Sequence, residues 1–165
     1  MIKPRFPTPD EVAQLACCLR RTIDAAYLDA MGHMNVRHYL GLFDDAGWKF
    51  FANLGMDDAY YATQNGAFAL QQLISYRAEV LAGEQVAIYP RLLGRSERKV
   101  HYMLFMINES RNNLAATLEE IGAHADLVQR RTSPFPPHLA ATIDSLLAAH
   151  QQLRWPAPLS GAMKA

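Results

Sequence analysis

Three polar side chains of kinds that can act on a carbonyl group occur close together in the chain. Asp29, His33 and Asn35 all belong to the stretch DAMGHMN at positions 29–35. A carboxylate can attack a carbonyl carbon directly or activate a water molecule, and an imidazole can orient that water. A side-chain amide can hold a loop in shape. These residues are therefore candidates for hydrolytic chemistry.

The candidate residues stand directly before a predicted long helix. Apolar residues recur with the spacing of one helix face, at positions 36, 39, 40, 43, 46, 47, 50, 51 and 54. This spacing predicts an α-helix of about five turns over Val36–Leu54. Asn35 is a favourable N-cap residue, and Gly55 suits the position after the last turn. The polar loop thus ends at a helix N-terminus, where free N–H groups and the positive dipole end point at whatever binds.

Length and charge limit the function classes that need to be considered. The chain has 165 residues, with 16 Lys plus Arg and 16 Asp plus Glu. One domain with a real core fits this length, and zero net charge without a basic run argues against nucleic-acid binding. No apolar run approaches the roughly 18 residues that span a bilayer. Residues 1–10 contain three prolines and no apolar signal region, so we expect a cytoplasmic protein without membrane contact.

The cysteines and histidines do not have the spacing of a metal site. Cys17 and Cys18 are adjacent and are expected to be buried or half-buried thiols. No C-x-x-C pair occurs, and no pair of histidines on a helix has an acidic third ligand. We expect neither a metal ion nor a cofactor.

Beyond the helix, the pattern changes to that of β-strands. Strands are predicted at 19–28, 66–78, 85–93, 99–108 and 114–128. The strand at 99–108 is apolar on both faces and should lie in mid-sheet, covered on each side. Pro90 indicates an edge or a bulge, Asn112-Asn113 indicates a hairpin turn, and Gly122 is a candidate kink.

The remaining segments are expected to be connections and short helices. Residues 1–10 should form an extended arm, 11–16 a helical turn, and 57–64 a connector with a turn near 58–61. Three prolines break regular structure over 130–137, before an amphipathic helix at 138–153 and a tail. One long helix on an antiparallel sheet is an α+β two-layer domain. The second sheet face would then be bare, which predicts a partner, most simply a homodimer.

Several of these motifs together resemble a known family. The pattern Asp29-x-x-Gly32-His33-x-Asn35, followed by a helix with Tyr39, Leu40 and Phe43, resembles the hotdog-fold acyl-CoA thioesterases of the 4-hydroxybenzoyl-CoA thioesterase type. The stretch 76–79 (YRAE) with Gly83-Glu84, and Ser96 before the central strand, agree with it. The resemblance covers roughly residues 20–135. The sequence GHMN at 32–35 and the segment 130–136 resemble the corresponding sequences of one branch of the family, the betainyl-CoA thioesterases.

The resemblance implies a fold, an assembly and an activity. The fold is α+β: a hotdog fold with an antiparallel sheet wrapped around one long central helix. A single hotdog domain would occupy residues 1–165, with its core at about 19–135, a C-terminal helix at about 138–153 and a short tail. Two subunits would pair their sheets edge to edge in a homodimer or homotetramer, with active sites between subunits. The activity would be hydrolysis of an acyl-CoA to free acid and CoA.

The family's catalytic carboxylate carries over to Asp29, as nucleophile or general base. His33 would orient water or hydrogen-bond Asp29 or the thioester carbonyl, and N–H groups of the helix after Asn35 would polarise that carbonyl. Each residue also has a structural alternative: Asp29 as a loop residue, His33 as a brace of the loop, and Asn35 as the helix cap. Related acyl-carrier-protein thioesterases have an Asn where this chain has Met31, which leaves a catalytic amide in doubt.

Further residues are candidates for binding the acyl-CoA. Tyr39 and Ser96 are candidates for contact with the substrate, with a turn as the alternative role of Ser96. Asp44 and Asp45 are candidates for a second carboxylate, one of which could lie across the cleft from the partner's loop, with a solvated helix face as the alternative. Arg130 and Arg131 could pair with CoA phosphates. A betainyl group would need an aromatic cage, for which Tyr39, Trp48, Tyr60, Tyr61 and Phe68 are available, although aromatic residues at helical spacing more often form a core.

Two other functions remain open from the sequence. A hotdog hydratase or dehydratase would act on enoyl or hydroxyacyl thioesters without releasing thiol, and a CoA-ligand-binding module would bind without turnover. The Asp four residues before the His on the loop before the helix favours hydrolysis. The acyl group, the choice between nucleophile and base, and the choice between dimer and tetramer stay open, as does contact of Arg130 and Arg131 with CoA.

Overall fold

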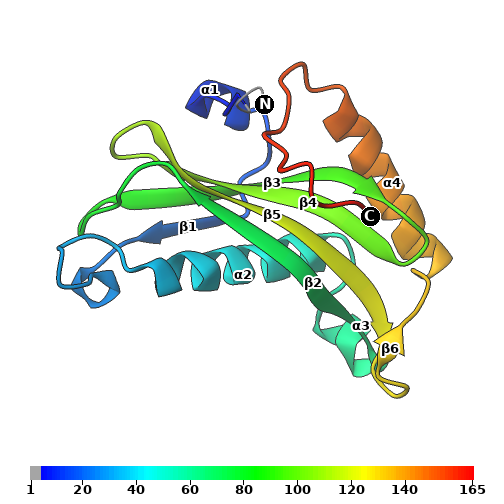
Figure 1. Cartoon of the computed structure of the whole chain (residues 1–165). Coiled ribbons are helices and arrows are strands. Elements are labelled where there is room, and N and C mark those ends of the chain that lie inside the picture. Colours follow the sequence, from blue (N-terminus) through cyan, green and yellow to red (C-terminus); the bar gives the residue numbers. More distant parts are fainter. Residues whose placement is uncertain (1–4) are drawn as a thin grey trace.

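The computed structural model describes residues 5–165, in which a curled antiparallel sheet holds one long helix against its concave face (Figure 1). That helix, α2 (Val36–Asn53), has 18 residues and buries Tyr39, Leu42, Phe43, Ala46, Gly47 and Phe50. The predicted helix is confirmed because the 3.6-residue period of its apolar side chains matches one continuous buried face.

The sheet places the strands in an order that differs from their order in the chain. β1 (Leu19–Thr22) pairs with β3 (Gln85–Arg95), followed by β4 (Lys99–Asn108), β5 (Asn113–Asp126) and β2 (Asn65–Tyr76). All neighbours are antiparallel. The predicted mid-sheet position of β4 is confirmed, and nine of its ten residues are buried. β2 forms the edge opposite β1.

The sheet is irregular near the residues for which the sequence predicted an edge, a turn or a kink. β1 pairs only with residues 85–88 of β3, so Pro90 lies where β3 has no strand on its outer side and needs no N–H there. Asn112 adopts a positive φ of 49° in the turn between β4 and β5. Opposite Gly122, where a kink was predicted in β5, the neighbouring strand β2 has a shift of register between Ala69 and Gln71, while the pairing of β5 with β4 is regular at this point.

Two sequence predictions near the N-terminus need correction. The strand predicted at 19–28 ends at Thr22, because the Asp24 side chain accepts a hydrogen bond from the Ala26 N–H at 2.8 Å and starts the 3₁₀-helix η1 (Ala25–Tyr27). The helical turn predicted at 11–16 is α1 (Pro9–Val12), which Thr8 and Glu11 begin with a capping box. The predicted arm at 1–10 lies partly outside the described residues, and its last two belong to α1.

The later helices lie near their predicted positions. α3 (Asp58–Ala62) follows α2, with Asp57 as its cap. β6 (Arg131–Thr132) pairs with the end of β5. α4 (Pro137–Gln151) lies beside β3 and adds Leu139 and Ile143 to the core. None of the helices within residues 5–165 combines the length and apolar character needed to cross a bilayer.

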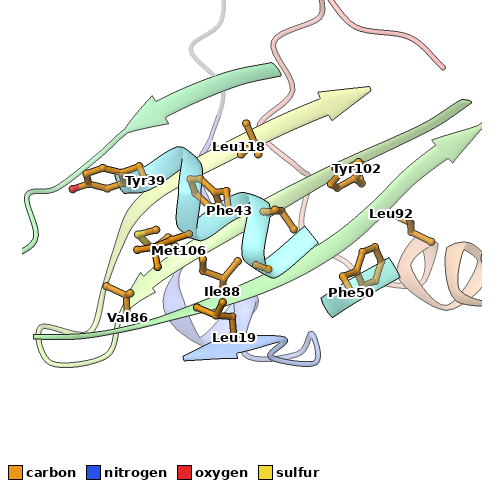
Figure 2. Packing of buried hydrophobic residues seen from close by; sticks show 14 of the residues in the cluster. Leu19, Tyr39, Phe43, Phe50, Val86, Ile88, Leu92, Tyr102, Met106 and Leu118 are labelled. Carbon is orange, nitrogen blue, oxygen red and sulfur yellow. The ribbon is translucent and has the colours of Figure 1, made fainter. Parts of the chain in front are cut away.

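The main core lies between α2 and the concave face of the sheet. Figure 2 shows Phe43 of α2 among side chains from β3, β4 and β5, including Ile88, Met106 and Leu118. Phe43 is fully buried. Truncating a buried aromatic residue of this kind typically costs about 3–5 kcal/mol. This packing fixes α2, and therefore the loop before it, relative to the sheet.

The prediction of a bare second sheet face is wrong. A separate buried cluster on that side contains Val12 of α1 and Trp155 of the C-terminal tail, packed on Phe105 of β4. The Arg91 guanidinium lies 4.2 Å from the centre of the Trp155 ring and donates to its carbonyl oxygen at 2.9 Å. Figure 1 shows α1 and the tail on the side of the sheet opposite α2. The chain therefore covers this face itself.

Part of the apolar surface that remains exposed lies on β2, at one edge of the sheet. Leu70, Leu73 and Tyr76 of β2 are 47%, 39% and 48% exposed. In the described sheet, β2 is paired only with β5. A twelve-residue strand with an unpaired edge and apolar side chains is a template for another strand.

Candidate active site

A tight loop presents the three candidate catalytic residues at the N-terminus of α2. The Asp29 N–H donates to the His33 carbonyl oxygen at 3.0 Å, and the Gly32 N–H donates to the Asp29 carbonyl oxygen at 3.0 Å. Gly32 has a φ of +84°, which glycine adopts without strain. Met34 is buried, and its N–H donates to the Val80 carbonyl oxygen at 2.8 Å. The loop is thus fixed at both ends and anchored to the core.

The Asp29 carboxylate has two different surroundings. Its Oδ1 accepts a hydrogen bond from the Met31 N–H at 2.8 Å, as in an Asx turn. Its Oδ2 lies 3.6 Å from Nδ1 of His33. The side chains of Asp29 and His33 are 17% and 30% exposed. One oxygen therefore holds the loop, while the other faces the imidazole at a partly open position.

Asn35 caps the helix, as predicted. Its Oδ1 accepts a hydrogen bond from the Arg37 N–H at 3.1 Å, and its carbonyl oxygen accepts one from the His38 N–H at 3.0 Å. Neither bond uses the Val36 N–H of the first turn. The loop that contains Asp29 therefore ends at a capped helix N-terminus, as expected from the sequence.

A cavity of about 110 Å³ lies farther along α2, between that helix and strands β2, β4 and β5. Asp44, Gly47 and Trp48 of α2 contribute to its wall, as does Glu120 of β5. Asp44 is nine residues beyond Asn35, which corresponds to about 14 Å along a helix axis. Asp29, His33 and Asn35 do not line this cavity. Within one chain, the candidate catalytic loop and the cavity are separate.

Aromatic rings form much of the cavity wall. They come from α2, α3, β2, β4 and the segment before α4: Phe43, Trp48, Phe51, Tyr61, Phe68, Tyr102 and Phe135. Trp48 and Tyr61 pack edge to face with ring centres 5.0 Å apart, as do Phe51 and Tyr102 at 5.1 Å.

Glu120 is a buried carboxylate in this wall. It is 6% exposed, and the Gln72 side-chain amide of β2 donates to its Oε2 at 2.9 Å. Burial raises the pKa of Glu120 above its ordinary value, against the hydrogen bonds of Gln72 and Tyr102, while the negative charge of Asp44 raises it further. The pKa of the Tyr102 hydroxyl is well above its ordinary value, because of burial first and Glu120 second.

His124 closes the cavity beside α3. Its Nε2 is hydrogen-bonded to the Tyr60 hydroxyl, and its Nδ1 lies 2.9 Å from Oγ of Ser133. Burial lowers the pKa of His124, so the imidazole is neutral at pH 7. This histidine braces the wall through two neighbouring hydroxyl groups.

The other predicted binding residues occupy three places. Tyr39 is 4% exposed and belongs to the core. Ser96 lies in the turn between β3 and β4, where its Oγ accepts a hydrogen bond from the Lys99 N–H at 3.2 Å. Arg130 and Arg131 are exposed beyond the end of β5, which pairs with the start of β2. Among these candidates, only Asp44 lines the cavity.

Sequence reasoning missed Glu120, Tyr102 and Gln72. Glu119 and Glu120 interrupt an otherwise apolar strand, and a charged pair inside a buried strand was the available signal. Glu119 faces the other side, where it bonds His101 at 2.9 Å. No group of three or more His, Cys, Asp or Glu side chains within residues 5–165 is arranged to hold a metal ion.

Comparison with solved structures supports the architecture. A Staphylococcus aureus protein solved in complex with CoA superposes with a TM-score of 0.81 at 19% identity, covering 92% of this chain and 96% of that one. A 1,4-dihydroxy-2-naphthoyl-CoA thioesterase from Synechocystis gives a TM-score of 0.68 at 14% identity, covering 78% and 95%. The protein has the hotdog fold predicted from its sequence.

Sequence comparison then defines the family. The model of the thioesterase-like superfamily matches residues 23–143. The chain belongs to this superfamily. A protein of Agrobacterium fabrum named L-carnitine dehydrogenase/betainyl-CoA thioesterase is 30% identical over 129 residues, covering 78% of this chain and 26% of that protein. The protein of the same name from Rhizobium meliloti is 25% identical over 134 residues. The chain spans about a quarter of the length of these relatives.

Proposed function

We propose that this protein hydrolyses an acyl-CoA thioester to a free acid and CoA, with Asp29 as the catalytic carboxylate. The carrying observation is the position of Asp29 in a fixed loop before the N-terminus of α2, with Oδ2 3.6 Å from His33. Membership of the thioesterase-like superfamily supports this chemistry. Of the two activities in the names of the curated relatives, the thioesterase is the one that this family match favours.

Thioester hydrolysis places modest demands on the site. A thiolate leaves readily, so a strong general acid is unnecessary, and one carboxylate can suffice. Asp29 would attack the carbonyl carbon and expel the CoA thiolate, and water would then hydrolyse the resulting anhydride to the free acid and regenerate Asp29. Alternatively, Asp29 would take a proton from a water molecule that attacks the carbonyl carbon and expels the CoA thiolate. In the second case, the proximity of His33 suits it to orient that water.

The N-terminus of α2 would stabilise the developing oxyanion. The Val36 N–H is not used by the Asn35 cap and is our candidate donor to the carbonyl oxygen. A donor that is already oriented needs no reorganisation during the reaction, and one such donor typically contributes about 10²–10³ in rate. The hydrogen bonds that hold the loop in shape would therefore also hold the N–H donor in the orientation that stabilises the oxyanion.

We propose a homodimer as the smallest active assembly, joined through the β2 edges. Antiparallel pairing about a two-fold axis would set the start of β2 in one copy beside the end of β2 in the other. The start of β2 carries Phe68 of the cavity wall. The end carries Tyr76, which packs on Tyr39 near the N-terminus of α2. Asp29 of one copy would then approach the cavity of the other.

In this assembly, the acyl group would enter the cavity and CoA would extend outward from it. Arg130 and Arg131 are exposed beyond the end of β5, at the cavity end of the sheet, and are our candidates for pairing with CoA phosphates. Ser96 remains a weaker candidate because it already completes a turn. We also propose a cytoplasmic location, which suits the free thiols of Cys17 and Cys18.

The activity can be tested by following thiol release from a panel of short-chain, long-chain, aromatic and betainyl CoA esters. The parent protein should release thiol, and Asp29→Asn should release it at least about a hundredfold more slowly. The asparagine oxygen can still accept the Met31 N–H, so the loop should keep its shape. Thiol release by folded Asp29→Asn at the parental rate would refute the role of Asp29. No release by folded parent protein would refute the activity.

A further inference from the structure

We propose that a second cavity, between α4 and the C-terminal half of α2, binds a compact neutral molecule that carries one hydrogen-bond acceptor. This space, which we name the α4 cavity, has a volume of about 150 Å³. Its wall includes Cys18, Phe50, Pro90, Leu146 and His150. The ligand class is a small cyclic ketone, which has a hydrocarbon body and a single carbonyl oxygen.

The α4 cavity is separate from the cavity of the candidate active site. The two have no lining residue in common. Phe50 of α2 lines the α4 cavity, whereas Phe51 lines the other one, and the two rings pack edge to face with their centres 5.0 Å apart. Phe51 in turn packs on Tyr102 of β4. A ligand in the α4 cavity would therefore leave the space proposed for the acyl group open.

The α4 cavity offers no counter-ion to a charged ligand. Among the described residues that line it, none is lysine, arginine, aspartate or glutamate. The imidazole of His150 is neutral at pH 7, because burial first and Arg91 second lower its pKa to about 4. Burial raises the pKa of the Cys18 thiol to about 12, so this thiol keeps its proton. An ion would lose its hydration here without gaining a partner of opposite charge, which favours a neutral ligand.

One side chain of the wall has a hydrogen-bond donor to spare. Nδ1 of His150 accepts a hydrogen bond from the Leu92 N–H at 2.9 Å. The proton of the neutral imidazole is therefore on Nε2, for which residues 5–165 provide no acceptor. The Cys18 thiol, in contrast, already donates to the Ile88 carbonyl oxygen at 3.3 Å. A carbonyl oxygen on the ligand would supply the acceptor that the His150 Nε2–H lacks.

The size of the α4 cavity suits a six-membered ring. An apolar cavity of about 150 Å³ is large enough to bind a benzene molecule, and the α4 cavity has this volume. Its lining residues Phe50 and Pro90 are buried, while Ala16 and Asn53 are exposed. The cavity thus extends from the core to the surface, so a ligand can enter it from solvent.

The test is an NMR titration of the isotope-labelled protein with cyclohexanone, which requires no turnover and is therefore independent of the proposed function. The Leu92 N–H donates to His150, and the Cys18 N–H donates to the Ile88 carbonyl oxygen at 3.0 Å, so both amide signals report on the wall. We expect cyclohexanone to shift these signals in a saturable way. Cyclohexylammonium has a similar shape but carries a charge and no acceptor, and should bind at least about tenfold more weakly.

Substitutions locate the ligand within the molecule. Ala16→Leu should fill the cavity from its exposed rim and raise the Kd for cyclohexanone at least about tenfold. Ala149→Leu is the matched control, because Ala149 is also exposed but does not line the cavity, and its Kd should equal that of the parent. His150→Phe keeps a ring but removes the donor, and should raise the Kd about two- to tenfold. Since Ala16 is exposed, Ala16→Leu tests the site even if His150→Phe fails to fold.

Several outcomes would overturn the proposal. The absence of a saturable shift in the parent protein, or unchanged binding by Ala16→Leu, would refute the site. Equal affinity for cyclohexylammonium would refute the neutral ligand class, and an unchanged Kd in folded His150→Phe would refute the role of its Nε2–H. Gly47→Leu alters only the wall of the other cavity and should bind cyclohexanone like the parent. Loss of binding in folded Gly47→Leu would show that the ketone occupies the candidate active site instead.

Discussion

Tyr39 of α2 packs edge to face on Tyr76 of β2, with ring centres 5.1 Å apart and planes at 84°. The contact joins the N-terminal end of the long helix to the last residue of the edge strand. The cavity lies beside the other end of both elements. Antiparallel pairing of two β2 edges about a two-fold axis would therefore bring the candidate catalytic loop of one copy toward the cavity of the other.

A charge on the exposed edge should prevent dimer formation. Leu73 of β2 is 39% exposed, and burying a lysine at this position in an interface would be unfavourable. In sedimentation velocity, Leu73→Lys should be a monomer, and thiol release should fall with loss of the dimer. Thr22→Lys on β1, at the opposite edge, should remain dimeric and active. A fully dimeric Leu73→Lys would exclude the β2 edge as the interface.

Removing the helix cap should affect stability as well as activity. Asn35→Ala loses the acceptor for the Arg37 N–H, which typically costs about 1 kcal/mol of unfolding free energy. The loop should also lose its fixed geometry, so thiol release should fall. Urea unfolding measures the first effect. Asn35→Asp keeps an acceptor and should recover most of the stability. Equal stability of Asn35→Ala and the parent would contradict the capping role.

A half-buried histidine, His150, should make the protein sensitive to acid. His150 Nδ1 accepts a hydrogen bond from the Leu92 N–H at 2.9 Å. Burial first, and Arg91 second, lower the pKa of His150 to about 4. The unfolded chain, with a histidine pKa near 6.5, binds the proton more readily. The stability contributed by neutral His150 is therefore complete above about pH 6.5 and is lost as the pH falls toward about 4.

His150→Asn tests this linkage. Asparagine has an oxygen that can replace Nδ1 as acceptor, but it does not titrate. Urea unfolding between pH 7 and pH 4 should show a smaller loss of stability in His150→Asn than in the parent. Equal losses in both proteins would show that protonation of His150 does not contribute to acid unfolding.

The helix, the central strand and the loop could be predicted because local patterns determine them. The period of α2 and the continuous apolar run of β4 each specify a single arrangement. The cap at Asn35 follows from residue type and position. The early end of β1 at Thr22 was not predicted, because Asp24, a local hydrogen-bond acceptor, competes with strand pairing at the point where the apolar pattern continues.

The covered sheet face and the cavity depend on contacts between distant parts of the chain. Trp155 packs on Phe105 from the C-terminal tail. The proline-rich sequence of this tail did not predict that it would pack against the sheet. Glu120 meets Asp44 across the cavity although 76 positions separate them in the chain. No local pattern contains such a pairing. The tight loop at 29–35, in contrast, is built within seven residues, and its shape is the one expected from the sequence.

Substitutions of Gly47 can test the role of the cavity separately from the stability of the fold. Gly47 is buried in the cavity wall, and a Cβ there would lie 3.9 Å from the Tyr102 hydroxyl, an ordinary contact. Gly47→Ala should thus fold and gain roughly 1 kcal/mol from helix propensity, measured by urea unfolding. Gly47→Leu should fill the cavity and stop thiol release. Full activity of Gly47→Leu would exclude the cavity as the acyl pocket.

The most direct test of the shared site is thiol release by a heterodimer of Asp29→Asn and Gly47→Leu, isolated with two different tags. Each homodimer should be inactive. In the heterodimer, the Gly47→Leu chain supplies an intact Asp29 and the Asp29→Asn chain supplies an intact cavity, so one of its two sites should be complete and thiol release should return. A heterodimer as inactive as the two homodimers would contradict a site that combines the loop of one copy with the cavity of the other.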